Sequence, residues 1–118
     1  MNRKDLPIAW VAHQGTVVFG TAALRTHDLD DRKDLSPWLG GVFVLPAFRR
    51  RGIASALCSA VERHAANRGI RKLFLFTLDQ QALYEPLGWR KMEDITWEGF
   101  GGVVMTKVMV DGVPPKRS

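Results

Sequence analysis

The stretch V-F-V-L-P-A-F-R-R-R-G-I-A-S-A-L-C-S-A-V, at residues 42–61, predicts a strand that leads directly into a helix. Its first four residues are apolar, as in a buried strand. Pro46 then stops the run, because proline has no N–H to extend a sheet ladder. From Ile53 onward, apolar residues recur every fourth position, which is the spacing of one helix face. The two segments therefore form a strand–turn–helix unit.

The turn of this unit carries three consecutive arginines, residues 49–51, followed by Gly52. The first amides of a helix have no partner inside it, and the helix dipole is positive there. Three cations at such a place repel one another, so the pattern favours a bound anion such as a phosphate group. Gly52 lets a bulky ligand approach the backbone, because it has no Cβ. The alternative is a plain strand–turn–helix with solvated arginines.

The composition is that of one globular domain suited to an anionic partner. The chain has 118 residues, enough for a single core, with 46% apolar and 25% charged residues. Lys and Arg number 17 against 12 Asp and Glu, which gives a net charge of +5 and a pI near 9.9. Nucleotide phosphates and nucleic acid would both suit this balance. We expect a folded core at about residues 7–110 and a flexible tail at residues 111–118.

The cysteine and hydropathy patterns exclude several classes of protein. Cys58 is the only cysteine, so an intramolecular disulfide and a cysteine-rich metal site are excluded. We expect Cys58 to pack as a small hydrophobe beside the apolar helix stripe. The chain shows no basic-then-apolar leader and no apolar run long enough to span a membrane. We therefore expect a cytoplasmic protein without a bound metal.

Apolar runs and turn signals along the chain predict one central mixed sheet with helices on its faces, an α/β (α+β) fold. A helix separates the third and fourth strands, which therefore pair in parallel. Gly40-Gly41 indicates a bulge or a bend, Asp79 is the expected cap of the second helix, and the last hairpin is expected to turn at residues 99–102. The order is β-β-β-α-β-α-β-β. The expected strands are residues 7–13, 16–25, 38–45, 71–78, 89–97 and 103–110, and the expected helices are residues 50–67 and 80–87.

Two motifs give the chain a resemblance to a known family. Residues 82–89 read A-L-Y-E-P-L-G-W, and the pattern V-x-P-x-x-R-x-x-G-x-A is met by Val44, Pro46, Arg49, Gly52 and Ala54. The pattern from Val44 to Ala54 resembles the acyl-CoA signature of the GNAT superfamily of N-acyltransferases. Residues 82–89 resemble the later motif of the same superfamily. The resemblance covers about residues 7–110. It departs at the start, where the family carries a strand and two helices that we expect to be missing, because only six residues precede Pro7.

The resemblance implies a binding site for acetyl-CoA, or coenzyme A, as co-substrate. In the family, backbone groups of the central strand hold the pantetheine, and the matching residues are Val42, Phe43 and Val44. The Val44 amide is then the expected oxyanion donor. The pyrophosphate is expected at the helix start, where it would meet backbone amides or side chains of Arg49, Arg50, Arg51, Gly52, Ile53, Ala54 and Ser55.

Tyr84 lies where the family places the proton donor for the departing coenzyme A thiolate. A phenol that titrates near pH 10 suits that role, and the alternative is an aromatic residue packed in the core. No residue declares itself as the general base that would take the proton of the amine. The open candidates are His27, Asp28, Asp34 and a water chain.

The resemblance thus implies an acetyl-CoA-dependent N-acetyltransferase that moves an acetyl group to a primary amine, on a small molecule or peptide, by direct attack in a ternary complex. The alternative is a non-catalytic acyl-CoA-binding or assembly module. A nucleic-acid binder is disfavoured, because the arginines are not interleaved with aromatic residues. We also expect a homodimer, because the strand at residues 7–13 would form a sheet edge and Val17, Phe19 and Leu24 would be exposed.

Overall fold

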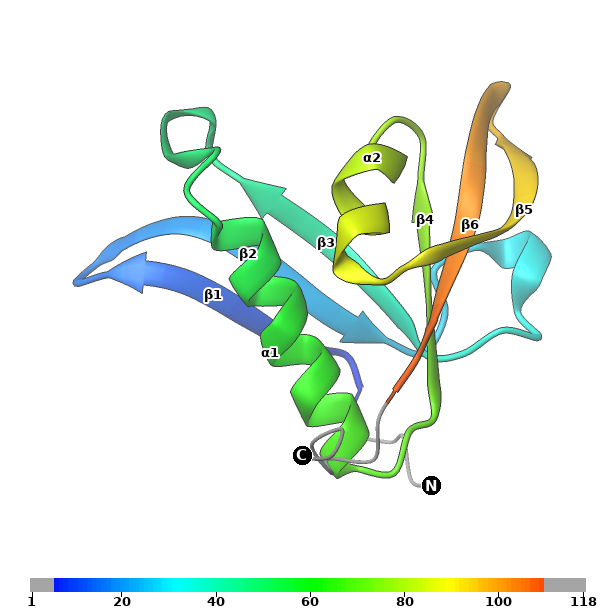
Figure 1. Cartoon of the computed structure of the whole chain (residues 1–118), viewed down its shortest axis with the longest axis horizontal. Helices are drawn as coiled ribbons and strands as arrows, with labels where there is room; N and C mark the ends of the chain where they lie inside the picture. Colours follow the sequence, from blue (N-terminus) through cyan, green and yellow to red (C-terminus); the bar gives the residue numbers. More distant parts are fainter. Residues whose placement is uncertain (1–5, 110–118) are drawn as a thin grey trace.

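The computed structural model describes residues 6–109, so the tail expected at residues 111–118 lies outside the described part. Six strands form one mixed sheet, and the α-helices follow the predicted order, which confirms the α/β fold class (Figure 1). The elements are β1 (Ile8–Gln14), β2 (Val17–Arg25), β3 (Trp38–Val44), α1 (Ile53–Asn67), β4 (Lys72–Thr77), α2 (Gln81–Tyr84), β5 (Arg90–Trp97) and β6 (Phe100–Val108). Three short 3₁₀ turns are η1 (Asp30–Arg32), η2 (Pro46–Phe48) and η3 (Glu85–Leu87).

The strand order in the sheet is β1-β2-β3-β4-β6-β5. β1, β2 and β3 are antiparallel neighbours, and β6 is antiparallel to both β4 and β5. Among the described strands only β3 and β4 run parallel, as predicted, because α1 crosses over between them. In the described part of the chain, no helix is long and apolar enough to cross a membrane.

β3 and β4 are paired at one point and then diverge (Figure 1). Trp38 of β3 lies opposite Phe74 of β4, and the described sheet contains no further pair between these two strands. β4 instead pairs with β6 along its whole length, from Lys72 to Thr77. The edge of β3 that faces β4 is therefore open as far as Val44.

A bulge in β3 bends this strand and sets which of its side chains face α1. The register between β2 and β3 shifts by one residue between Thr21 and Ala23, so β3 contains one extra residue. Gly41 adopts a left-handed conformation there, with φ of +59°. The extra residue reverses the alternation of side chains, so Leu39 and Val44 both reach the same core. The predicted bulge is confirmed.

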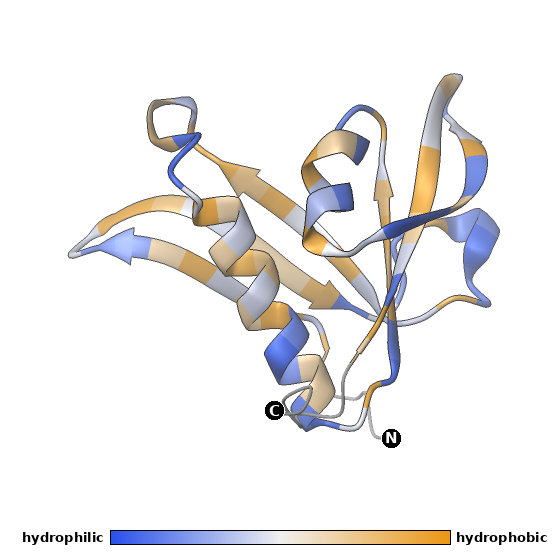
Figure 2. Ribbon diagram, in the orientation of Figure 1, coloured by the Kyte–Doolittle hydropathy of each residue, from blue (hydrophilic) through white to orange (hydrophobic). Residues whose placement is uncertain are grey.

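The main core lies between the sheet and α1. The predicted helix stripe is buried at Leu57, Val61 and Ala65. It belongs to one cluster with Leu24 and Leu39 of the sheet, and burial of each leucine contributes roughly 2 kcal/mol. In Figure 2, apolar positions run along the strands behind α1, whereas polar residues gather in the segment before β3.

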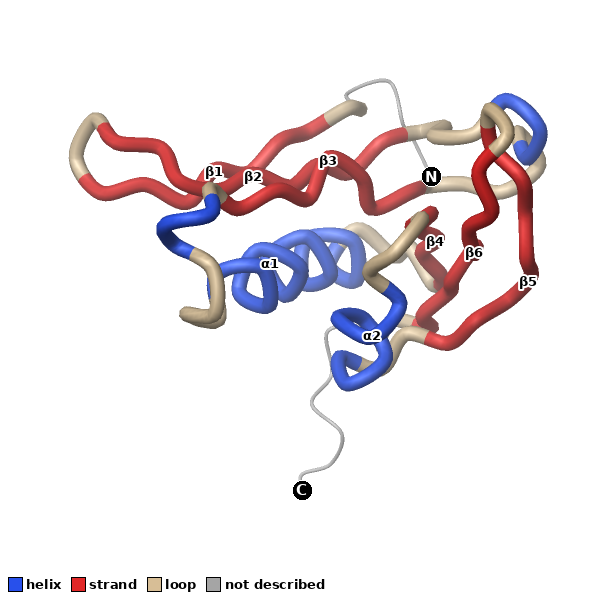
Figure 3. Tube along the Cα trace, turned by 90° about the horizontal axis from the view of Figure 1, so that it is seen from above, coloured by secondary structure: helices blue, strands red, loops and turns tan. Residues whose placement is uncertain are grey.

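Both helices lie on the same face of the sheet, as the view from above shows (Figure 3). The opposite face is covered at one end by residues 26–37, where Leu29 and Trp38 pack against β4 and β6. Over β1 and β3 the same face leaves Val11 and Phe43 exposed. The sheet is thus covered unevenly by the described residues.

Two predicted boundaries are wrong because of left-handed backbone conformations. Helix α1 begins at Ile53 rather than at residue 50, since Arg50 and Gly52 have φ of +66° and +77°. The last hairpin turns at Glu98-Gly99 rather than at residues 99–102. Both turn residues have positive φ, as a type I′ turn requires.

Two predictions about side chains are also wrong. Asp79 does not cap α2, because Gln80 occupies the cap position and no side-chain hydrogen bond caps this helix. The N–H of Gln80 itself donates to Oγ1 of Thr77 at 2.8 Å. Leu24 is fully buried rather than exposed, since its side chain points toward α1. Phe19 is half-buried and stacks on the ring of Phe48, with ring centroids 4.8 Å apart.

Candidate functional site

A cavity of about 520 Å³ opens at the end of β3, between the start of α1 and α2. It brings together all the predicted coenzyme-binding residues except Arg51, together with Tyr84, but none of the three candidate bases. The lining residues are Val42, Phe43, Val44, Phe48, Arg49, Arg50, Gly52, Ile53, Ala54, Ser55, Gln80, Leu83 and Tyr84.

The start of α1 offers backbone amides to this cavity. The first bond of the helix runs from the N–H of Ala56 to the carbonyl of Gly52 at 3.0 Å, and no described side chain caps this end. The N–H groups of Ile53, Ala54 and Ser55 therefore have no partner within the helix. A Cβ added at Gly52 would meet no atom within 4 Å, so the approach to these amides is open. This arrangement suits an anion.

The arginines of the turn differ in their surroundings. The guanidinium of Arg49 lies over the ring of Phe43, with 5.6 Å between Cζ and the ring centroid. Its Nε also donates to the carbonyl of Val44 at 2.8 Å. The guanidinium of Arg51 lies over the ring of Phe48, with 5.3 Å between Cζ and the ring centroid. Arg50 lines the cavity, whereas Arg51 does not. Arg49 thus lines the cavity and also forms a hydrogen bond with the end of β3.

The backbone at the end of β3 points toward the open edge of the strand. The N–H of Leu45 donates to the carbonyl of Phe19 in β2 at 2.9 Å. Because successive residues of a strand direct their backbone groups to opposite edges, those of Val42 and Val44 face the open edge and those of Phe43 face β2. The carbonyl of Val44 already accepts the hydrogen bond from Nε of Arg49. The N–H of Val44 is therefore the donor that this residue presents at the open edge.

Tyr84 brings a protonated phenol to the cavity from α2. Its side chain is only 7% exposed, and its ring packs edge-on against Trp89 with centroids 6.3 Å apart. Burial raises the pKa of the Tyr84 phenol above its ordinary value, and the nearby Cys58 thiol adds to this effect. The phenol therefore keeps its proton throughout the physiological pH range.

Cys58 packs inside the core as expected and has no exposed thiol. It is 1% exposed, and burial raises the pKa of its thiol to about 12. The charge of Glu62 also raises this pKa, whereas the charge of Lys107 lowers it. A buried thiol that remains protonated is not a nucleophile.

The three candidate bases do not line the cavity. His27, Asp28 and Asp34 belong to the segment between β2 and β3, which lies at the opposite end of β3 from Val44 (Figure 1). Asp28 and Asp34 each accept a hydrogen bond from a nearby arginine, at 3.1 Å and 2.9 Å. The described residues that line the cavity include no carboxylate and no imidazole. No three described His, Cys, Asp or Glu side chains are grouped so as to hold a metal ion.

Three lining residues escaped the sequence analysis: Phe48, Gln80 and Leu83. Leu83 is apolar and 37% exposed beside the cavity, and its place one residue before Tyr84 was an available signal. Phe48 follows the proline that ends β3, and the ring stacking that places it is a tertiary contact. Nothing in the sequence distinguishes Gln80 from other polar residues in turns.

Comparison with known proteins identifies a family for most of the chain. Residues 6–91 match the family profile described as an acetyltransferase (GNAT) domain. The matched range contains both sequence motifs, the whole of the turn before α1, and Tyr84.

Individual relatives agree with this match. The chain is 37% identical over 83 residues to proteins named aminoglycoside N(6′)-acetyltransferase type 1 from Salmonella typhimurium and Salmonella enteritidis. These alignments cover 65% of the chain and 57% of the relatives, so the chain spans little more than half of their length.

Solved structures share the fold. An aminoglycoside 6′-acetyltransferase type Ii superposes with a TM-score of 0.74 at 20% identity, over 91% of this chain and 72% of that one. A GNAT family acetyltransferase from Elizabethkingia anophelis with acetyl-CoA bound superposes with a TM-score of 0.68 at 19% identity, over 87% of this chain and 76% of that one.

The buried thiol predicts a pH dependence of stability. Because folding raises the pKa of Cys58 to about 12, the unfolded chain loses this proton first as pH rises past 9, and the stabilisation is lost between pH 9 and 12. From pH 8 to 10, the free energy of unfolding is expected to fall by about 1 kcal/mol more in the parent than in Cys58→Ala. Urea midpoints at both pH values measure this, and equal pH dependence in the two proteins would contradict the prediction.

Proposed function

The chain belongs to the GNAT family of acetyltransferases, and on this premise we propose that it is an acetyl-CoA-dependent N-acetyltransferase. In the proposed reaction the acetyl group passes to a primary amine by direct attack in a ternary complex. One observation carries the proposal. A single cavity holds a helix start whose first amides have no partner within the helix and a protonated phenol, with the open edge of β3 beside both.

Coenzyme A is proposed to bind with its pyrophosphate at the start of α1. The amides of Ile53, Ala54 and Ser55 and the positive end of the helix dipole supply the anion site, and Arg50 adds a positive charge at the same cavity. The pantetheine arm is proposed to follow β3, where the backbone of Val42 faces the open edge. The remaining residues of the turn, Arg49, Arg51 and Gly52, shape this site or add to its positive charge.

The N–H of Val44 is proposed to hydrogen-bond the thioester carbonyl oxygen, where negative charge develops when the amine nitrogen attacks the carbonyl carbon. Tyr84 gives its proton to the sulfur as the carbon–sulfur bond breaks and the sulfur keeps the electron pair. The surplus proton of the amine passes to water, because the lining residues supply no carboxylate or imidazole. Water then returns a proton to the phenolate, and the site is restored.

The acceptor is proposed to be a small molecule or a peptide that carries a primary amine. Aminoglycosides are the first amines to test, because the curated relatives are named for acetylation of an aminoglycoside amine. These relatives are longer than this chain, so a panel that includes simple amines and short peptides belongs in the same assay.

A non-catalytic acyl-CoA-binding or assembly module is the second candidate. The lining without a carboxylate or imidazole favours it, because such a module needs no base. Release of free thiol from acetyl-CoA, measured with the amine panel, separates the two. Amine-dependent release supports the enzyme, and coenzyme A binding without release supports the module.

We also propose that the protein acts in the cytoplasm as a homodimer. Acetyl-CoA as co-substrate and an unpaired thiol at Cys58 both suit a reducing compartment. β1 is a sheet edge, and Val11 and Val17 nearby are 52% and 54% exposed. Pairing of two such surfaces about a two-fold axis would cover the edge and these side chains.

The Gly52→Asp variant is expected to bind coenzyme A at least about tenfold more weakly, because a carboxylate would face the pyrophosphate. Isothermal titration calorimetry measures the Kd. Gly69→Asp is the matched control, since Gly69 has φ of +79° against +77°, and its Cβ would likewise meet no atom within 4 Å. It lies past the other end of α1 and is expected to bind like the parent. An unchanged Kd for Gly52→Asp would refute the phosphate site.

The Tyr84→Phe variant is expected to lower kcat by about a hundredfold, because it removes the proposed proton donor. The phenyl ring retains the packing against Trp89, so the Kd of coenzyme A is expected to stay the same. Steady-state kinetics at saturating amine measure kcat. An unchanged kcat, with chemistry shown to limit the rate, would mean that Tyr84 serves only in packing.

Light scattering over a dilution series is expected to give twice the 13.2 kDa mass of one chain. Val11→Lys is expected to yield monomers, because it places a charge on the surface proposed to pair. Val108→Lys, at a valine that is 66% exposed on β6, is the control and is expected to leave the dimer intact. A parent protein at one-chain mass throughout would overturn the proposal.

A further inference from the structure

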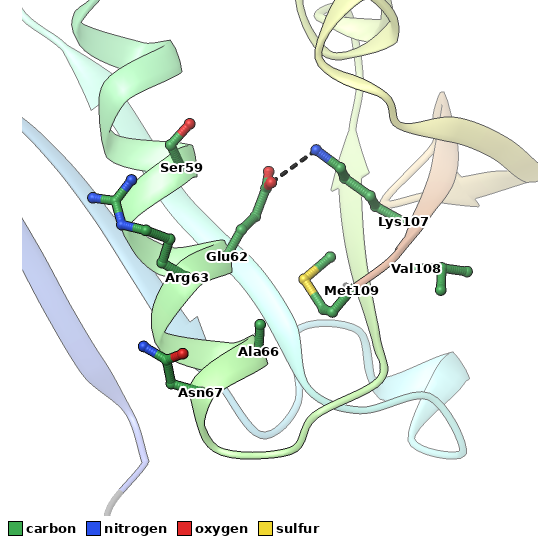
Figure 4. A pocket seen from close by; sticks show the side chains of 8 residues that line it. All are labelled: Ser59, Glu62, Arg63, Ala66, Asn67, Lys107, Val108 and Met109. Atoms are coloured by element: carbon green, nitrogen blue, oxygen red, sulfur yellow. Dashed lines mark hydrogen bonds and ion pairs between the residues drawn. The ribbon is translucent and has the colours of Figure 1, made fainter. Parts of the chain in front are cut away.

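A network of partly buried polar groups links α1, β6 and the segment that follows α2. The Nζ of Lys107 forms an ion pair with Oε1 of Glu62 at 2.8 Å and donates to the carbonyl of Leu87 at 2.6 Å. The indole N–H of Trp89 donates to the other oxygen of Glu62 at 3.2 Å. Figure 4 shows Glu62 of α1 and Lys107 of β6 reaching toward each other across the space between these elements.

Two partners in this network contact the segment that carries Tyr84. Leu87 ends η3, the turn that continues α2, so Lys107 holds the carboxyl end of this segment. Trp89 packs its ring against Tyr84 and donates its backbone N–H to the carbonyl of Tyr84 at 3.3 Å. Lys107 and Trp89 thus both contact the segment that carries the Tyr84 side chain.

The other end of the network is fixed to the helix that forms the proposed phosphate site. Ala54, Cys58 and Glu62 follow one another at intervals of four residues, so they lie on one face of α1. Ala54 lines the cavity at the start of the helix, and Glu62 holds Lys107 and Trp89 two turns later. The same helix thus carries the proposed anion site at its start and, at Glu62, the acceptor of the bonds from Lys107 and Trp89.

Stability alone does not account for this ion pair. The side chains of Glu62 and Lys107 are only 16% and 26% exposed, so both charges lose much of their hydration. In such a place an apolar pair of similar size is often as stabilising as an ion pair, because desolvation offsets the attraction. What the polar groups add is direction, since each carboxylate oxygen has its own donor and the ammonium reaches a specific carbonyl.

We propose that Glu62, Lys107 and Trp89 are positioning residues for proton transfer, which hold the Tyr84 phenol in place relative to bound coenzyme A. The inference rests on the proposed function of Tyr84 as the proton donor. It concerns how this donor is held, and it adds no further group to the chemistry.

The test combines Lys107→Met with Tyr84→Phe. Lys107→Met keeps an unbranched apolar side chain and removes the ammonium, and it is expected to lower kcat on the order of tenfold through misplacement of the phenol. The KM for acetyl-CoA is expected to change less than twofold, because the start of α1 is untouched. In the Tyr84→Phe background the same substitution is expected to change kcat less than twofold, because the group it positions is gone.

A second variant and a control accompany this cycle. Trp89→Phe keeps one aromatic ring but removes the indole donor to Glu62 together with part of the buried ring volume. It is the second test if circular dichroism shows that Lys107→Met does not fold. It is expected to lower kcat severalfold in the parent and not in Tyr84→Phe. Lys91→Met removes a surface ion pair of the same length, 2.8 Å to Asp94, and is expected to leave kcat within twofold.

The outcomes separate this inference from the proposed function. If Tyr84→Phe is slow but Lys107→Met or Trp89→Phe lowers kcat equally in both backgrounds, or not at all, the positioning role is overturned and the proton donor stands. If Tyr84→Phe is as fast as the parent, the proposed proton donor is overturned, and the positioning role falls with it.

Discussion

The single residue pair between β3 and β4 is the constraint on which the rest of the structure depends. Because Trp38 and Phe74 are paired and no described pair follows, the sheet divides into two halves that diverge from this point. The divergence leaves the edge of β3 open, and the cavity beside it contains both Val44 and Tyr84. α1 packs on the first half, shares its buried core with β4 and β6 of the second, and is also linked to β6 through Glu62, so one helix spans the gap that the strands leave.

Local patterns explain how much of this was predictable from the sequence. Apolar periodicity located all six strands and α1, and the helix between β3 and β4 made their parallel pairing a topological necessity. The two glycines in β3 indicated the bulge because few other residues adopt its conformation. The cavity lining was predicted in two ways: the strand–turn–helix pattern indicated the anion site, and the resemblance to the GNAT superfamily implied the strand residues and Tyr84.

The features that could not be predicted depend on contacts between distant segments or on strand direction. Arg50 adopts a positive φ, which cannot be predicted from an arginine in the sequence and which is incompatible with a right-handed helix. The start of α1 was therefore predicted too early. His27, Asp28 and Asp34 are close to β3 in sequence but precede it, whereas the cavity lies at the carboxyl end of that strand. The ion pair of Glu62 and Lys107 joins residues 45 positions apart, and no local pattern indicates it.

Because of the bulge, the number of residues in β3 affects the shape of the strand end that lines the cavity. β2 and β3 are paired with each other on both sides of the extra residue. A chain that lacked Gly41 would therefore form an unbroken ladder between these strands. The bend that the bulge gives to β3 would be lost with it, and this bend lies shortly before Val44, whose backbone borders the cavity. Deletion of this one residue would therefore change the direction of the strand end that lines the cavity while it keeps the pairing of that strand with β2.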